Sequence, residues 1–271
     1  MSFIQTILAN VHKSLHPERR KRIRKFQAFH FRQLQHVIFR ALFGSNLKAL
    51  AVLYGSDKWG SHWYAQHYER HFSCLRKKRI NILEIGIGGY DDPEAGGESL
   101  RMWRAYFPNS RIYGIDICDK HVHDERRIKT FRGSQVDEIF LGQVVQEIGD
   151  IHIIIDDGSH RNEHVLGTFG FLFPKLSKDG IYVVEDTQTS YWPNIGGSSS
   201  DFNRADTTIG FLKKLVDGLN YAEFDLPQYE PTYYDKHITA IHFYHNMVFI
   251  QKGFNKEGSN LLSKGEWCKP W

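Results

Sequence analysis

The sequence has few cysteines and no long apolar run, and each absence excludes a class of protein. Three cysteines, Cys74, Cys118 and Cys268, are spread over 271 residues, and none forms a CxxC pair. This spacing argues against a disulfide framework or a structural zinc site, so a reducing compartment fits best. No apolar stretch approaches the ~20 residues of a membrane span, and the first residues lack the plan of a signal peptide. We therefore expect a soluble, cytoplasmic protein without a transmembrane segment.

Positive charge is concentrated at the N-terminus. Residues 1–50 contain ten Lys or Arg and one acid, Glu18, whereas the rest of the chain is net acidic. The cluster ERRKRIRK, Glu18–Lys25, could contact an anionic lipid surface, a nucleic acid or a phosphorylated carrier. Apolar residues recur at helical spacing between Phe26 and Phe43, which favours a solvated helix or an arm packed on a neighbouring subunit. We predict a basic helical N-terminal extension over residues 1–50, and a homo-oligomer.

Strands and helices alternate from Arg79 onward. The expected strands are Ile80–Gly88, Arg111–Cys118, Lys129–Gly133, Ile151–Asp157 and Gly180–Asp186, followed by a hairpin over Ala240–Gly253 that turns at His245–Asn246. The expected helices are Leu47–Tyr54, Ser99–Phe107, Val136–Ile148, His164–Leu176 and Thr207–Leu219. Such alternation predicts an α/β fold whose mostly parallel sheet has helices on both faces. The terminal hairpin completes a seven-stranded sheet.

A segment rich in histidine and aromatic residues precedes these strands. It runs from Tyr54 to Phe72 and reads YGSDKWGSHWYAQHYERHF. Because its residues show no clean periodicity, we predict a binding loop rather than a core element. Its histidines, His62, His67 and His71, could contact a ligand, but packing or surface roles are favoured for each.

The first expected strand runs into glycines, which let the backbone approach a ligand closely. It ends in Glu84-Ile85-Gly86-Ile87-Gly88, and an acid at this position suits a cationic ligand better than a pyrophosphate. Asp116 closes the second strand, where a carboxylate can accept hydrogen bonds from a ribose diol. Ser134 and Gln135 follow the third strand and could hold an adenine edge. Together these features are typical of a class I, Rossmann-like fold that binds S-adenosyl-L-methionine.

Carboxylates follow the next two strands. Asp156-Asp157-Gly158-Ser159-His160 ends the fourth strand, and Glu185-Asp186 ends the fifth. Each motif alone also fits a capping turn or a solvated loop start. Because parallel strands end at the same edge of a sheet, we expect the four carboxylates to converge, where a hard divalent cation would offset their repulsion. His160 could then act as a base, since histidine titrates between pH 5 and 8.

Five longer stretches carry a family resemblance. They read YGSDKWGSHWYAQHYERHF, LEIGIGGYDDPEAGGESLRMWRAYFP, IIIDDGSH, VVEDTQTSYWP and IHFYHNMVFIQKG. From about Leu47 to Asn260 the chain resembles the metal-dependent sugar O-methyltransferases of macrolide and related pathways. The resemblance is to the mycinamicin VI 2''-O-methyltransferase and demethylmacrocin O-methyltransferase group. The macrolide enzyme carries a large additional N-terminal domain, whereas about fifty basic residues precede the matching region here.

The resemblance implies a role for particular residues. It implies Asp157, Glu185 and Asp186 as ligands of Mg²⁺ or Mn²⁺, and His160 as the catalytic base. The implied cofactor site contains Glu84, Gly86, Gly88, Asp116, Ser134, Gln135 and Asp156. The implied substrate contacts are Tyr64, Ser99, Tyr191 and Trp192.

We therefore expect a methyltransferase domain over residues 51–271 that uses S-adenosyl-L-methionine and a divalent metal. Its expected acceptor is a sugar hydroxyl of a glycoside, polysaccharide or glycosylated natural product, so the substrate is a small molecule or an oligosaccharide. The alternative is a metal-dependent catechol or phenol O-methyltransferase. A nucleic-acid partner is not expected, because DDGSH stands where an amine methyltransferase carries Asn/Asp-Pro-Pro-Tyr/Phe, and most of the chain is acidic.

Overall fold

The computed structural model describes residues 43–263 and 266–267. The chain divides into two compact units, Met1–Asn46 and Leu47–Trp271. Most of the predicted basic extension lies outside the described residues, so its helices and the homo-oligomer stay predictions. No helix within the described part has the length and apolarity needed to cross a bilayer.

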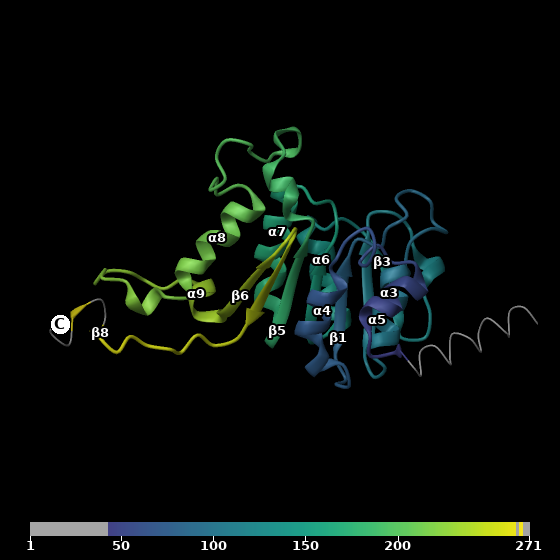
Figure 1. Cartoon of the computed structure of the whole chain (residues 1–271), viewed down its shortest axis with the longest axis horizontal. Helices are drawn as coiled ribbons and strands as arrows, with labels where there is room; N and C mark the ends of the chain where they lie inside the picture. Colours follow the sequence, from purple (N-terminus) through teal and green to yellow (C-terminus); the bar gives the residue numbers. More distant parts are fainter. Residues whose placement is uncertain (1–42, 264–265, 268–271) are drawn as a thin grey trace, which may run out of the picture. The chain divides into compact units, whose positions relative to one another are not determined.

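A seven-stranded sheet forms the centre of the second unit (Figure 1). Its strands are β1 (Asn81–Ile85), β2 (Arg111–Asp116), β3 (Ile128–Arg132), β4 (Ile151–Asp156), β5 (Leu176–Glu185), β6 (Ile238–Tyr244) and β7 (Met247–Lys252). The order is β3-β2-β1-β4-β5-β7-β6, with β1 to β5 parallel and β7 antiparallel to both of its neighbours. The predicted Rossmann-like, mostly parallel sheet is confirmed, including the hairpin that turns at His245–Asn246. A separate two-stranded hairpin, β8 (Leu262–Ser263) and β9 (Glu266–Trp267), follows.

Helices cover both faces of the sheet. One face packs against α3 (Leu47–Tyr54), α4 (Ala65–Phe72) and α5 (Glu98–Tyr106). The other face packs against α6 (Glu138–Ile148), α7 (Asn162–Leu172) and α8 (Thr208–Gly218), and the short α9 (Tyr233–His237) follows α8. Because successive strand residues point to opposite faces, Ile153 and Ile155 enter the first core and Ile154 the second.

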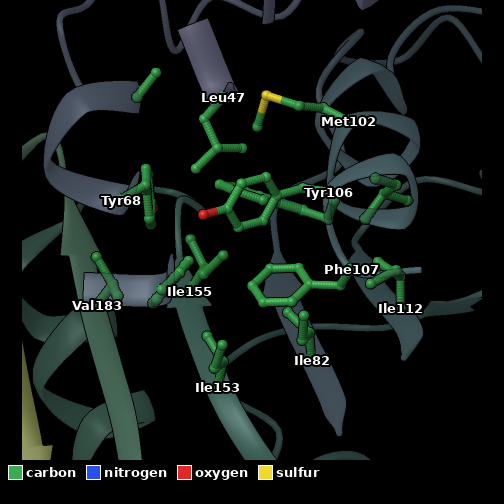
Figure 2. Packing of buried hydrophobic residues seen from close by; sticks show 14 of the residues in the cluster. Leu47, Tyr68, Ile82, Met102, Tyr106, Phe107, Ile112, Ile153, Ile155 and Val183 are labelled. Carbon is green, nitrogen blue, oxygen red and sulfur yellow. The ribbon is translucent and has the colours of Figure 1, made fainter. Parts of the chain in front are cut away.

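The first core holds the segment that precedes the sheet in place. Figure 2 shows Leu47, Tyr68, Tyr106 and Phe107 packed over the apolar residues of the central strands. Each of these four side chains is fully buried. Burial of one such side chain stabilises the fold by about 1.5–3 kcal/mol, so α3, α4 and α5 are fixed firmly on this face.

The prediction of a binding loop over Tyr54–Phe72 is wrong for its second half. Ala65–Phe72 is the helix α4, and its residues Ala65, Tyr68 and Phe72 are buried. They are spaced three and four residues apart, which puts them on one helix face. The first half, Gly55–Tyr64, is irregular as expected.

The expected helix His164–Leu176 is also wrong at both ends. The helix α7 covers Asn162–Leu172, a 3₁₀ turn covers Phe173–Lys175, and β5 starts at Leu176. Pro174 in this turn has no amide hydrogen to donate and clashes with a preceding helical carbonyl, so the α-helix ends before it.

Candidate active site

The site lies where the chain order of the sheet reverses. Strand β1 pairs with β2 on one side and with β4 on the other, and β4 pairs in turn with β5. In open parallel sheets, ligands bind at the carboxyl ends of the strands next to such a reversal. The loops that follow β1, β2, β4 and β5 carry most of the predicted site residues.

The turns after β1 and β4 touch at Gly86. A Cβ at Gly86 would lie 2.0 Å from the carbonyl oxygen of Asp157, and φ of Gly86 is 89°, a left-handed value that favours glycine. The amide of Asp157 donates to the carbonyl of Ile85 at 2.9 Å. Gly86 therefore lets the predicted cofactor turn lie directly against the first predicted metal ligand.

Gly86→Ala is expected to cost roughly 2–4 kcal/mol of unfolding free energy, from backbone strain and overpacking together. Binding of S-adenosylhomocysteine should weaken more than tenfold, because the turn must move away from Asp157. Thermal unfolding and calorimetric titration measure the two effects. The matched control is Gly167→Ala in α7, where an added Cβ meets nothing within 4 Å. Equal behaviour of the two variants would show that the Gly86 contact is not needed.

Asp116 lies against the same turn. Its Oδ2 accepts from the amide of Ile87 at 3.0 Å, and its Oδ1 accepts from the amide of Cys118 at 2.9 Å. Each carboxylate oxygen keeps a further lone pair, so the group can still accept from a diol. Gly88, with φ 79°, belongs to this turn as well. The structure therefore brings Asp116, Gly86 and Gly88 together.

Glu84 is fully buried behind this turn. The hydroxyl of Ser99 donates to its Oε2 at 2.8 Å, whereas its Oε1 accepts no hydrogen bond from any described residue and has Lys58 Nζ as an ion-pair neighbour at 3.4 Å. Burial raises the pKa of Glu84, and Lys58 opposes that rise. A buried acceptor with spare capacity fits a cofactor that carries an ammonium group. Ser99, predicted as a substrate contact, lies on this cofactor side.

Gln135 and Asp156 brace the loops after β3 and β4 against each other. The Gln135 amide donates to Asp156 Oδ1 at 3.3 Å and accepts from the amide of Ser159 at 2.8 Å. Tyr182 donates to the other Asp156 oxygen at 3.3 Å, and burial raises the pKa of Asp156 to about 7. Asp156 is buried on the face opposite Asp157, so the expected convergence of four carboxylates is wrong for Asp156, because consecutive strand residues point to opposite faces. Ser134, whose Oγ accepts weakly from the amide of Val136 at 3.4 Å, starts the same loop.

Three ligand-type residues meet at the strand ends. Asp157, His160 and Asp186 each offer one atom that could bind a metal, and these three atoms lie within 4.8 Å of one another. The Nε2 of His160 is 3.6 Å from Asp186 Oδ2. His160 and Asp186 both adopt left-handed backbone values, φ 56° and 51°. Asp and His adopt this region more readily than most residues, and such conformations cluster at active sites. Two carboxylates and one imidazole are a donor set that fits a divalent metal.

Glu185 lies behind this group. Its side chain is 2% exposed, and its Oε1 accepts from Lys58 Nζ at 2.7 Å and from the Tyr68 hydroxyl. Burial, reinforced by the Asp157 charge, raises the pKa of Glu185. The structure thus brings Asp157 and Asp186 into one group with His160 but leaves Glu185 outside it, and the assignment of all three carboxylates as metal ligands stays a prediction.

The ammonium of Lys58 is the feature that the sequence did not indicate. Lys58 is fully buried, and its Nζ lies 2.8 Å from Asp157 Oδ2 and 3.4 Å from Glu84 Oε1. Burial alone would lower the pKa of Lys58, but Asp157, Glu185 and Glu84 outweigh it and raise that pKa. From the sequence, a lysine between Asp57 and Trp59 in an irregular segment is expected to be exposed, because no periodicity there indicates burial.

Of the other predicted substrate residues, Tyr64 is buried beside Asp186, whereas Tyr191 and Trp192 lie on the surface. The Tyr64 hydroxyl donates to Asp186 Oδ1 at 2.6 Å, and His62 stacks on the Tyr64 ring with centroids 4.7 Å apart. Tyr191 and Trp192, in the loop after Asp186, are 39% and 47% exposed. Exposed aromatic rings are suited to the apolar faces of a sugar.

The loop that carries Tyr191 and Trp192 is held by hydrogen bonds to the buried side chain of Asn162. The Ser190 hydroxyl donates to Asn162 Oδ1 at 3.2 Å, and the Asn162 amide group donates to the Thr189 carbonyl at 3.4 Å. Both side chains are buried. The anchoring holds Tyr191 and Trp192 on the outer side of the loop.

Comparison with known proteins confirms the resemblance. The chain is 45% identical over 215 residues to mycinamicin VI 2''-O-methyltransferase from Micromonospora griseorubida, which covers 79% of the chain and 54% of that protein. It is 48% identical over 210 residues to 8-demethyl-8-alpha-L-rhamnosyl tetracenomycin-C 2'-O-methyltransferase from Streptomyces olivaceus, covering 77% and 55%. The chain spans about half the length of these curated relatives. No family model matches it.

Solved structures agree with the fold. The MycE methyltransferase of the mycinamycin biosynthetic pathway, in complex with Mg and SAH, has a TM-score of 0.76 and 45% identity. The match covers 79% of this chain and 55% of that one. A further structure of the same protein, with Mg, SAH and mycinamycin VI, has a TM-score of 0.75.

Proposed function

The chain is a relative of the sugar O-methyltransferases that modify macrolide and tetracenomycin glycosides, and from this relationship we propose that it methylates a sugar hydroxyl. The methyl donor is S-adenosyl-L-methionine, and the reaction depends on a divalent metal. The observation that carries the proposal is the meeting of Asp157, His160 and Asp186 within 4.8 Å, next to the Gly86 turn. The acceptor is a small glycoside, as it is for the relatives named above.

Each part of the site has a task in this reaction. The Glu84–Gly88 turn binds the cofactor together with Asp116. The sulfonium of this cofactor offers an electrophilic methyl group. Asp157 and Asp186 hold the metal, with Glu185 as the third predicted ligand. When bound, Mg²⁺ or Mn²⁺ lowers the pKa of a hydroxyl and orients its oxygen.

His160 and the aromatic residues complete the chemistry. His160 takes the hydroxyl proton at Nε2, and Asp186, whose Oδ2 lies 3.6 Å from that nitrogen, stabilises the imidazolium that forms. Tyr191 and Trp192 orient the sugar ring. With the proton removed and the oxygen aligned with the methyl group, the transfer is an in-line displacement in which positioning supplies much of the rate.

A turnover assay with labelled cofactor tests the proposal. The full chain is incubated with methyl-labelled S-adenosylmethionine, Mg²⁺ or Mn²⁺, and two acceptor panels, rhamnosyl polyketide glycosides and catechols. We expect label in the glycosides and none after chelation of the metal. Turnover of catechols alone would replace the sugar acceptor by a phenol, and turnover in the presence of a chelator would remove the metal from the mechanism.

A further inference from the structure

Lys58 occupies an unusual place for a lysine. Its side chain is fully buried, and its Nζ lies 2.7 Å from Glu185, 2.8 Å from Asp157 and 3.4 Å from Glu84. It comes from the irregular segment between α3 and α4, whereas the carboxylates come from the ends of β5, β4 and β1. One ammonium therefore links the segment before the sheet to three neighbouring strands.

Without Lys58, the three carboxylates at the ends of β1, β4 and β5 would have no positive charge in contact with all of them. Glu84 and Glu185 are nearly or fully buried, and the Asp157 side chain is 22% exposed. Unpaired buried charges are costly, and like charges crowded together repel. Since Lys58 is the cation in direct contact with all three, it offsets much of this repulsion.

The contacts also orient the carboxylates. Lys58 holds Oδ2 of Asp157 and Oε1 of Glu185, and the Tyr68 hydroxyl donates to the same Glu185 oxygen. Tyr64 holds Oδ1 of Asp186 at 2.6 Å. One oxygen of each predicted metal ligand is thus held by a side chain from residues 58–68, and the second oxygen of Asp186 faces His160 Nε2 at 3.6 Å.

We infer that Lys58 is a built-in counter-cation, a positioning residue that keeps Asp157 and Glu185 assembled before the divalent metal binds. The inference rests on the proposed function for the metal, but the repulsion that it describes exists in the metal-free protein. Partners that hold the outer oxygens of metal ligands commonly set ligand orientation.

The decisive variant is Lys58→Met, which keeps much of the length and removes the charge. Breaking a buried ion pair on one side should lower the melting temperature by about 10 °C in a chelator. Mg²⁺ should then restore more of the melting temperature in this variant than it adds to the wild type, because it replaces part of the missing positive charge. An equal drop with and without Mg²⁺ would mean that Lys58 only packs.

A double variant separates this inference from the proposed function. In Lys58→Met with Glu185→Gln, one of the repelling charges is gone, so the metal-free melting temperature should rise above that of Lys58→Met alone. Additive losses from the two substitutions would overturn the counter-cation role. This comparison is made entirely in a chelator. If Mg²⁺ fails to stabilise even the wild type, the metal in the proposed function is wrong, while the double variant still decides the role of Lys58.

Discussion

Asp157→Ala is expected to lower methyl transfer on the order of 10³-fold, because metal coordination supplies several kcal/mol of the catalysis. Asp157 belongs to the group with His160 and Asp186, and its side chain is the most exposed of the three carboxylates around Lys58. Its removal leaves Asp186 without the neighbouring oxygen ligand. The protein should still fold, because Lys58 keeps Glu84 and Glu185 as partners.

The measurement combines turnover with calorimetric titration of Mg²⁺, and circular dichroism reports on folding. The matched control is Asp150→Ala, an exposed aspartate just before β4, at the opposite end of the strand from Asp157. This control should keep both activity and metal binding. Metal-dependent turnover at the wild-type rate in Asp157→Ala would remove Asp157 from the ligand set.

The sheet and the position of the site could be predicted because both depend on local patterns. Runs such as Ile151–Asp156 are short and almost wholly apolar, which identifies a strand covered on both faces. Once the strands are parallel, their last residues must meet at one edge. For this reason the sequence alone predicts that the motif around Asp157 and the motif around Asp186 lie close together.

What each carboxylate contacts could be predicted only in part. Asp156 and Asp157 are consecutive, so strand alternation points them to opposite faces, which the expected convergence of all four carboxylates did not take into account. The partner of Asp157 is different in kind. Lys58 lies 99 residues earlier in the chain, and its burial depends on the packing of α3 and α4 in the first core of the sheet. Such a contact is set by tertiary structure and leaves no local periodicity.

Replacing His160 gives the second large effect, and asparagine is the informative substitution. The backbone of His160 has φ 56°, where asparagine is tolerated better than alanine, so His160→Asn removes the base with little added strain. The rate should fall by ~10²–10⁴ if His160 takes the proton. Single-turnover methyl transfer from bound S-adenosylmethionine measures this loss without a contribution from product release.

The same variant separates two roles that the geometry allows, since His160 lies in the donor group with Asp157 and Asp186. Mg²⁺ prefers oxygen ligands, which favours His160 as the base and leaves the carboxylates to the metal. If His160 is the base, His160→Asn should be slow, should bind Mg²⁺ as tightly as the wild type, and should be partly rescued by added imidazole. If His160 is instead a metal ligand, the variant should bind Mg²⁺ more weakly, and imidazole should not restore its rate. His237→Asn, a partly exposed histidine at the end of α9 and at the opposite edge of the sheet, is the control and should leave the rate nearly unchanged.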